Sequence, residues 1–465
     1  METQNAFTIY EQDNSGRNIK IYDISFAENR TQNADVSRDL LLQTRLILPP
    51  FSKETRYKHY PMDFKNACGC LYASWLSELY YFNYQLFDSL QAFSSSIAGL
   101  LASRAVLEGV GVGDANATAT NALLITITQD AISRLATILF AWRIGTALEP
   151  EAKRYRLLAD IFNDTSMILD CLSPALPKSV RIFTLCISSA FRALCGVAAG
   201  GAKAALSVHF ARANNIGDLN AKDSSQETVI GLLGMLAGSF IVARVTTSTS
   251  TWSLLFLLLF IHIMTNYLAV RSVTMLALNR QRATIVYSNF RATRSILDPI
   301  QTSKKEYVFA RGGKLHDSMG GYIGQCKVEK SIQRLLLDDT TVIPQLLHIL
   351  SREKYILSFM VHSGTAQLQI CLRDDATSAD HLKAWIHATE LAHRVEERKT
   401  VYCSNKDMLD MIDEVYQNIS EIFPVFFEGL KTKGWDVGCD FILTKQVNRF
   451  RITGSSRSSE SKKDI

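Results

Sequence analysis

The chain has 465 residues, of which 47% are hydrophobic and 20% are charged, and its formal net charge at pH 7 is +5. This hydrophobic content is high for a soluble protein but too low for a chain embedded in a membrane throughout, so we expect a membrane block with soluble flanks. The modest charge, without interleaved basic and aromatic residues, argues against nucleic acid as a partner. The nine scattered cysteines form no CxxC pair, so we expect no metal site and a reducing, cytosol-facing environment.

The first element in chain order is a predicted β-hairpin over residues 7–24. Hydrophobic and polar residues alternate on both sides of the turn-forming run Asp13-Asn14-Ser15-Gly16, which is the pattern of two paired strands. Residues 27–60 are polar and are expected to be irregular. We therefore assign residues 1–84 to an N-terminal cytosolic region.

A block of apolar stretches follows, and the last of them is the strongest. The 26 residues from Val245 to Val270 contain no acidic or basic side chain other than His262. About 20 apolar residues at a rise of about 1.5 Å each span the hydrocarbon core of a bilayer. We therefore predict an α-helical membrane bundle over residues 85–280, with about six transmembrane helices arranged as in half of a major-facilitator fold. The predicted spans are 86–107, 121–142, 157–174, 179–200, 228–245 and 252–275.

Basic residues in the connecting loops indicate the topology independently. The loops after the second, fourth and sixth stretches are rich in Lys and Arg, whereas residues 108–120 and 246–251 contain none. Because basic loops stay on the cytoplasmic side, this alternation predicts six spans with both termini in the cytosol. The alternative is that only the last two helices insert and that the first four form a soluble bundle.

Beyond residue 300 the sequence predicts a small cytosolic α+β domain, over residues 300–452. It comprises a strand pair at 354–362 and 366–374, amphipathic helices at 378–397 and 407–423, and a last strand at 440–452. Residues 453–465 are Ser-rich and charged, which predicts disorder. In this tail, Lys462 and Lys463 resemble the dilysine signal of endoplasmic-reticulum membrane proteins, so we expect that location.

Charged residues inside the predicted spans are the first candidates for a functional site. Charges at such depth are costly and usually face a partner or a water-filled cavity. Asp130 and Arg134 are four residues apart, so they share a helix face and can pair. Asp160 and Asp164 are likewise four residues apart and share a face. Arg192 has ten uncharged residues on each side, and we expect it to face the bundle interior near Asp130, Asp160 or Asp164. The set is interpreted either as structural ion pairs between helices or as a polar translocation or substrate site: Asp130, Arg134, Asp160, Asp164 and Arg192.

A second candidate lies between residues 196 and 239, where small residues flank a polar segment. Gly196–Gly200 and Gly234–Gly238 are small-xxx-small pairs, which allow helix backbones to approach closely in lipid. Ser224 and Glu227 match a capping box, which predicts that the fifth helix begins there. The alternative is a cytosolic gate or headgroup-binding loop, with polar contacts from His209, Arg212, Asn214, Asn215, Asp218, Lys222, Asp223, Gln226 and Glu227.

No catalytic constellation accompanies these candidates. Arg311-Gly312-Gly313-Lys314 lacks the spacing of a phosphate-binding loop, so a flexible loop is the favoured interpretation. His381, His387 and His393 are six residues apart, and that spacing does not place them on one helix face for a metal. We therefore expect no enzymatic activity, no catalytic residues, no metal and no cofactor.

Several long segments resemble the Root UVB-sensitive (RUS) family. The most specific is RANNIGDLNAKDSSQETVIGLLG, preceded by GGAKAAL, and further agreement lies in residues 90–114, 134–145 and 153–174. The resemblance implies a membrane-associated protein from a family linked to vitamin B6 homeostasis and to the ultraviolet-B response. It implies no catalytic residues, because the family has no settled biochemical activity.

Two functions of different classes remain open at this stage. The first is transport or binding of a small polar or anionic solute by a multi-pass membrane protein, as a homodimer or with a RUS-family partner. The second is a non-catalytic membrane adaptor or scaffold whose C-terminal domain binds a protein partner. Neutralising Arg192 separates them, because a carrier would lose transport and keep its partners.

Overall fold

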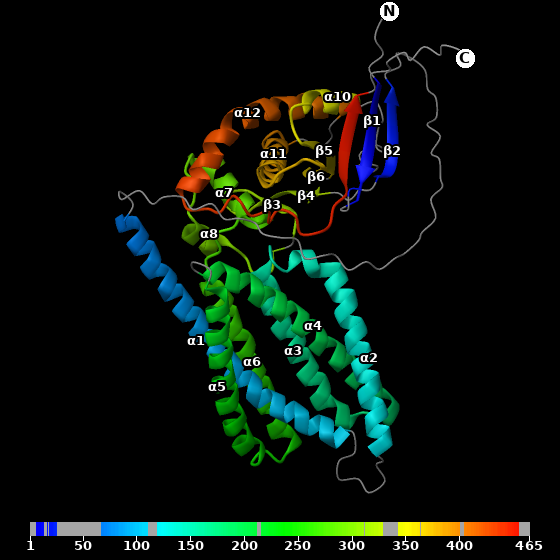
Figure 1. Cartoon of the computed structure of the whole chain (residues 1–465), viewed down its shortest axis with the longest axis vertical. Helices are drawn as coiled ribbons and strands as arrows, with labels where there is room; N and C mark the ends of the chain where they lie inside the picture. Colours follow the sequence, from blue (N-terminus) through cyan, green and yellow to red (C-terminus); the bar gives the residue numbers. More distant parts are fainter. Residues whose placement is uncertain are drawn as a thin grey trace, which may run out of the picture.

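The computed structural model describes residues 6–13, 16, 18–25, 67–109, 119–211, 215–310, 312–328, 343–362, 364–399 and 404–454. The described residues form two bodies along the long axis of the molecule, a bundle of long helices and a smaller α/β domain (Figure 1). Several predicted features lie outside these residues: the segment 27–60, most of the 108–120 loop, Arg212, Asn214, Lys462 and Lys463.

The bundle contains six helices, and five of them are long and apolar enough to cross a membrane. The exception is α3, whose last 18 residues carry Arg156, Asp160, Asp164 and Asp170. The sequence predicts six membrane spans, and the length and hydropathy of five helices agree with that prediction. The helices are α1 (Ala67–Gly109), α2 (Ala119–Ile144), α3 (Ala152–Leu172), α4 (Lys178–Phe210), α5 (Ile216–Val242) and α6 (Ser248–Ser272).

Helix packing in the bundle is centred on α1 and α3. α1 packs against α5, α6 and α3, while α3 also packs extensively against α4. The predicted close approach at Gly234 and Gly238 is present, because a Cβ atom at these positions would lie 2.7 Å from Ser96 Cβ and from Leu100 Cδ1 of α1. Gly196 and Gly200 have open space in the direction of a Cβ atom, so this pair makes no such contact.

The start of α5 differs from the prediction. The helix begins at Ile216, after Asn215, and Ser224 lies inside it, where its carbonyl accepts a hydrogen bond from Thr228 Oγ1. The capping box at Ser224 and Glu227 is therefore wrong. Ser224 and most of its neighbours are exposed on the N-terminal half of α5, and a capping pattern cannot distinguish a polar helix surface from a true helix start.

The soluble domain is built on a seven-stranded sheet in the order β2-β1-β7-β6-β4-β3, with β5 also paired to β6. β1 and β2 form the predicted N-terminal hairpin, and β5 and β6 form the predicted antiparallel pair. The sequence placed the hairpin in a separate region, whereas β1 pairs with β7, so that Ile9 lies opposite Ile452. The strands are β1 (Ala6–Gln12), β2 (Asn18–Ser25), β3 (Lys314–His316), β4 (Tyr322–Val328), β5 (Tyr355–His362), β6 (Thr365–Arg373) and β7 (Arg449–Gly454).

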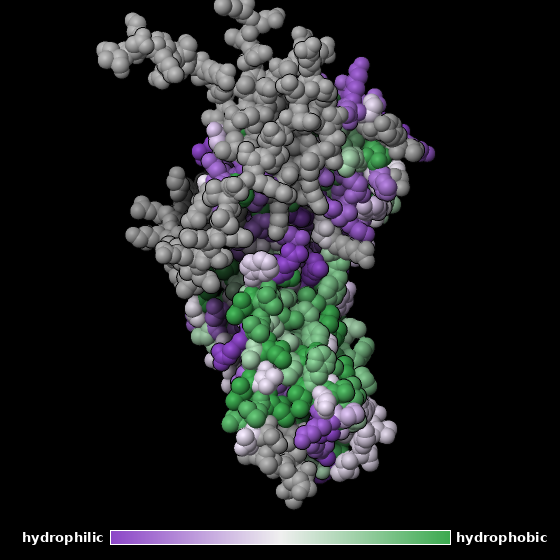
Figure 2. Space-filling view, turned by 90° about the vertical axis from the view of Figure 1, so that its right-hand side faces the viewer, coloured by the Kyte–Doolittle hydropathy of each residue, from purple (hydrophilic) through white to green (hydrophobic). Residues whose placement is uncertain are grey.

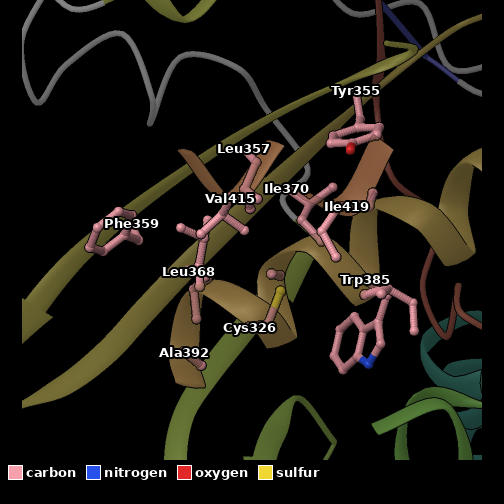
Figure 3. Close-up of a cluster of buried hydrophobic side chains, with 14 of the residues drawn as sticks. Cys326, Tyr355, Leu357, Phe359, Leu368, Ile370, Trp385, Ala392, Val415 and Ile419 are labelled. Atoms are coloured by element: carbon pink, nitrogen blue, oxygen red, sulfur yellow. The ribbon is translucent and has the colours of Figure 1, made fainter. Parts of the chain in front are cut away.

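Helices cover this sheet and complete one large hydrophobic core (Figure 3). Trp385 of α11 is fully buried there, and its indole Nε1 donates to Thr284 Oγ1 of α7 at 3.0 Å. The helix predicted at 407–423 continues through Pro424 to Thr432, because its apolar stripe also continues. The helices are α7 (Arg280–Thr293), α8 (Pro299–Lys305), α10 (Ile343–Ile349), α11 (Ser378–Glu397) and α12 (Asn405–Thr432).

A buried ion-pair triad joins the two bodies. Glu306, which follows α8, accepts from Lys153 Nζ at 2.7 Å and from Arg282 Nη1 at 2.8 Å. Its backbone carbonyl also accepts from Arg271 Nη1 at 2.6 Å. Burial by itself would raise the pKa of Glu306, but Arg282 and Lys153 outweigh it and hold that pKa below its ordinary value. The carboxylate is thus charged at neutral pH and fixes the base of α3 to the soluble domain.

Candidate functional site

Three charged residues of α3 form a stripe that faces the other helices of the bundle. Arg156, Asp160 and Asp164 are spaced four residues apart, so they lie above one another on one helix face. Both aspartates are buried, which is unusual for acidic residues in an apolar bundle. Asp160 and Asp164, two of the charged residues selected from the sequence, thus lie on one face of α3 and form the centre of the candidate site.

α6 supplies two polar residues to this stripe. His262 Nδ1 lies 2.7 Å from Asp164 Oδ1, and His262 Nε2 lies 3.5 Å from Asp160 Oδ2. One turn further along, Asn266 Nδ2 donates to Asp160 Oδ2 at 2.6 Å. The sequence prediction missed both residues, although a histidine and an asparagine four residues apart in an otherwise apolar span are a usable signal.

α1, which packs directly against α6, completes the site. Arg156 Nη2 donates to Asp88 Oδ1 at 2.5 Å and to Gln91 Oε1 at 2.9 Å. Gln91 Nε2 donates to Asp160 Oδ2 at 2.6 Å, so the same side chain links the guanidinium to the carboxylate. We call the resulting group the inner cluster, which comprises Asp88, Gln91, Arg156, Asp160, Asp164, His262 and Asn266.

The inner cluster has more acidic than basic groups and leaves some polar atoms unmatched. Three carboxylates face one guanidinium and one imidazole. Asp164 Oδ2, Asn266 Oδ1 and Arg156 Nε are buried and accept or donate no hydrogen bond within the part of the chain that the structure describes. Buried polar atoms without partners cost free energy, so they mark positions where a proton or a bound molecule can supply the missing partner.

A second polar group lies where the sequence predicted a loop. Asp223 and Glu227 lie in the N-terminal half of α5, and both accept from Lys203 Nζ of α4 at 2.7 Å. Gln226 Nε2 donates to Ser89 Oγ of α1 at 2.8 Å. We call these residues the outer cluster. The gate or headgroup loop is thus wrong for this part, because the polar side chains belong to a packed helix end.

The other predicted loop residues that the structure describes lie at the start of α5 and at the end of α4. Asp218 and Lys222 form an exposed pair within α5 at 2.9 Å, and Asn215 precedes the helix without a side-chain cap. His209 lies near the end of α4, where its ring meets Phe210 with centroids 5.1 Å apart.

The other predicted intramembrane charges do not join the inner cluster. Arg192 forms its ion pair with Asp170, which also accepts from Ser188 Oγ at 2.5 Å. The ion pair with a carboxylate agrees with the prediction, but the partner is none of the candidates Asp130, Asp160 and Asp164. The Arg192 side chain is 55% exposed, so the predicted orientation toward the interior is wrong. Asp130 and Arg134 are exposed on α2, and neither forms an ion pair with any residue that the structure describes. The spacing of charged residues predicts which of them share a helix face, but it does not predict which helix packs against that face.

The inner cluster does not have the ligand set of a metal centre. Among the residues that the structure describes, no group of three or more His, Cys, Asp or Glu side chains could hold a metal ion. The cluster instead offers two kinds of interaction. Gln91 and Asn266 form hydrogen bonds, and the carboxylates and His262 can exchange protons. This arrangement can bind a small polar molecule or a proton inside the bundle.

Two family profiles match the chain, one over each body. The profile described as a vitamin B6 photo-protection and homoeostasis domain matches residues 77–294, which include the whole inner cluster. The profile described as the C-terminal region of the Root UVB sensitive protein matches residues 333–443. No solved structure matches the chain.

Curated relatives agree with these profiles. The chain is 35% identical over 280 residues to "RUS family member 1" of Dictyostelium discoideum, covering 59% of this chain and about half (53%) of that protein. It is 32% identical over 333 residues to "Protein root UVB sensitive 3" of Arabidopsis thaliana, covering 71% of this chain and 75% of that protein. It is also 23% identical to "Protein root UVB sensitive 2, chloroplastic" of the same plant, over 76% of this chain and 77% of the relative. The chain belongs to the Root UVB sensitive (RUS) family.

Proposed function

We propose that this chain is a multi-pass membrane protein that binds a small polar solute at the inner cluster and carries it across the bilayer without chemical change. The observation that carries the proposal is a set of three carboxylates, an arginine and a histidine, connected by ion pairs and hydrogen bonds between the helices of an apolar bundle. Ionisable residues at such depth mark substrate or ion pathways in membrane proteins.

The surface of the bundle supports insertion into lipid. Large apolar side chains point outward along it, such as Trp142, which is 81% exposed. Figure 2 shows that the viewed face of this part of the molecule is largely hydrophobic, with hydrophilic residues above and below that region. A contiguous apolar surface of this extent is unfavourable in water and matches the hydrocarbon core of a bilayer.

The sheet of the soluble domain supports an even number of crossings. β1 and β2 precede the bundle and β7 follows it, yet β1 pairs with β7 in one sheet. The chain must therefore leave and return to the same side of the membrane. Five crossings would be odd, so we propose that α3 is the sixth, with its charges directed inward. The basic loops place this side in the cytosol.

The charges of the inner cluster restrict the solute. Carboxylates outnumber basic groups, so the cluster favours a neutral or cationic molecule over the anion that the sequence suggested. The matched domain is described as a vitamin B6 photo-protection and homoeostasis domain, so we propose an unphosphorylated form of vitamin B6, such as pyridoxine, as the solute. Its hydroxyl groups can donate to Asp164 Oδ2 and Asn266 Oδ1, and its ring nitrogen can accept from Arg156 Nε. A phosphate ester would be repelled by the carboxylates.

The test is binding and uptake with purified protein in lipid. The protein is reconstituted in nanodiscs for calorimetry and in vesicles for uptake of radiolabelled pyridoxine, with pyridoxal 5′-phosphate as the second probe. We expect saturable binding of pyridoxine, weaker binding of the phosphate ester, and loss of both binding and uptake in Asp164→Asn. The matched control is Asp218→Asn, which neutralises an exposed aspartate of α5 and should change nothing.

Two results would contradict the proposal. One is the absence of binding and uptake of either probe by protein that is folded and inserted. The other is an Asp164→Asn variant that transports as well as the unsubstituted protein. A protein that binds no solute but captures a partner through its C-terminal domain would support the adaptor function.

We also propose the endoplasmic reticulum as the compartment, on the basis of Lys462 and Lys463. The supporting argument is that these residues follow β7, on the side that the basic loops place in the cytosol. Replacing both lysines by serine should move the N-terminally tagged protein to the Golgi or the cell surface. An unchanged distribution would reject this signal.

A further inference from the structure

We propose that α2 is the contact surface for a second copy of this chain, with Asp130 of one copy paired to Arg134 of the other. The inference rests on the proposed insertion of α2 into the membrane, but it does not depend on solute binding. It starts from the two charged residues that the inner cluster leaves unexplained.

The first step is the depth of the two charges. α2 runs from Ala119 to Ile144, and Asp130 and Arg134 lie on either side of its midpoint. At a rise of about 1.5 Å per residue, both Cα atoms are within about 4 Å of the middle of the helix. The edge of the hydrocarbon core is roughly 15 Å from its centre, so neither side chain can reach water along the helix.

The second step is that a single copy offers these residues no partner. Both are exposed, and neither forms an ion pair with any described residue, although they are four positions apart. None of the residues in the most apolar part of α2 is buried, and α2 packs mainly against α4. Ser133 Oγ, which donates to Ser189 O of α4 at 3.0 Å, fixes which face of α2 is covered. A single copy in a bilayer would therefore expose two charges to lipid, which is costly.

The third step is the pattern around the charges. Leu123, Ile127, Asp130, Arg134 and Ile138 are spaced by four, three, four and four residues, so they form one stripe along α2. The three apolar members are 58%, 54% and 64% exposed. Figure 2 views the molecule from the side on which α2 lies in Figure 1, where the surface is largely hydrophobic.

The fourth step is the choice of occupant. The stripe carries one acidic and one basic residue, so it is complementary to itself. Two copies inserted in the same direction are related by a two-fold axis along the bilayer normal, which brings identical stripes together. A diagonal contact one helical turn apart then pairs each aspartate with the arginine of the partner subunit, as charged residues do across parallel coiled coils. A partner with a single sign of charge would leave one of the two residues unpaired.

The experiment exchanges the charges in full-length protein that carries two different epitope tags. Asp130→Arg gives a stripe with two basic residues, and Arg134→Asp gives a stripe with two acidic residues. We expect each variant to lose self-capture at least tenfold in mild detergent, because like charges then face each other. Co-expression of the two variants should restore capture to near the unsubstituted level.

Cysteine cross-linking in native membranes provides a measurement that does not alter the charges. Ile138→Cys lies on the stripe, whereas Leu139→Cys is about 100° further around the helix and is also exposed. We expect disulfide-linked dimers for the first variant only. Equal or absent cross-linking at both positions, or charge variants that associate normally, would overturn the proposal, as would capture of a different protein in place of the second copy.

Alkaline carbonate extraction separates this inference from the proposed function. If the unsubstituted protein is extracted, the membrane insertion itself is wrong and the stripe has no role in lipid. If the protein resists extraction but is a monomer in nanodiscs, only the α2 contact is wrong. Variants are compared only where they remain in the carbonate-resistant fraction, so that a failure to insert is not mistaken for loss of association.

Discussion

The soluble domain and the helical bundle place opposite chemistry in their interiors. The soluble domain has one continuous core with large side chains such as Trp385, Phe359 and Tyr355. The bundle has three smaller apolar clusters, and its centre holds the buried ion pairs of Arg156 with Asp88 and Asp160. In the soluble domain burial of apolar surface drives packing, whereas the bundle leaves large apolar side chains such as Trp142 on its outer surface. The two bodies thus differ in the surface that they expose, as expected if the bundle is inserted in lipid as proposed.

The largest contrast is expected for two tryptophans. Trp385→Ala removes the fully buried indole of the soluble core and should lower the free energy of unfolding by about 3–5 kcal/mol. Trp142→Ala removes an exposed indole of α2 and should change that free energy by less than about 0.5 kcal/mol. Unfolding of both variants is followed in lipid nanodiscs against guanidinium. Equal losses in the two variants would contradict a lipid-facing surface for α2.

The second contrast concerns pH, because the soluble core contains buried neutral histidines. Burial, with a smaller contribution from Lys383, lowers the pKa of His387 to about 3, and burial with Arg291 lowers that of His393 to about 4. The unfolded chain binds these protons near pH 6.5, so stability is present above that pH and is lost as the pH falls.

At pH 5 the loss from His387 alone should be about 2 kcal/mol. Hydrogen exchange along α11 should therefore accelerate between pH 7 and pH 5, and His387→Gln should reduce this dependence. A pH-independent exchange rate in α11 of the unsubstituted protein would reject the buried neutral state.

The third contrast concerns close helix packing. Gly238→Leu places a side chain against Leu100 and Ile97 of α1, and overpacking of this kind costs about 1–3 kcal/mol. Gly196→Ala, at a glycine of α4 with open space around it, should be neutral or slightly stabilising. Melting temperatures in detergent compare the two. A tolerant Gly238 would show that α1 and α5 do not meet as closely as described.

The smallest effect should be common to both bodies. Ser404 accepts from Asp407 N at the start of α12, and Thr247 accepts from Ser250 N at the start of α6. Both caps lie at exposed helix ends, so Ser404→Ala and Thr247→Ala should each cost about 1 kcal/mol. A much larger loss at Thr247 would place that end of α6 in lipid, where no water replaces the lost acceptor.

Local patterns predicted much of the fold. Alternation around a turn gave the N-terminal hairpin and the β5–β6 pair, and the apolar stripe gave α11. Features that depend on distant segments were missed. Nothing in the sequence near β1 indicates that its partner is β7, more than 400 residues later, because the backbone groups of a strand edge can pair with any other strand.

The same limit applies to the candidate site. The spacing of Asp160 and Asp164 predicted a shared face, yet His262 and Asn266 come from another helix. Arg192 was assigned to the wrong carboxylates because Asp170 was not weighed as a partner and the rotation of α3 against α4 cannot be read from either sequence. The start of α5 was misplaced because a polar helix surface resembles a loop when its contacts on α1 and α4 are unknown.

The pairing of β1 with β7 has a consequence for biosynthesis. The ribosome makes β1 and β2 before any helix of the bundle, and it makes β7 after all the other elements. The hairpin is therefore complete before the bundle is made, and the edge of β1 stays open until β7 has been synthesised. The sheet closes only when synthesis has passed residue 454, so a nascent chain arrested before that point carries an unpaired strand edge that chaperones must protect.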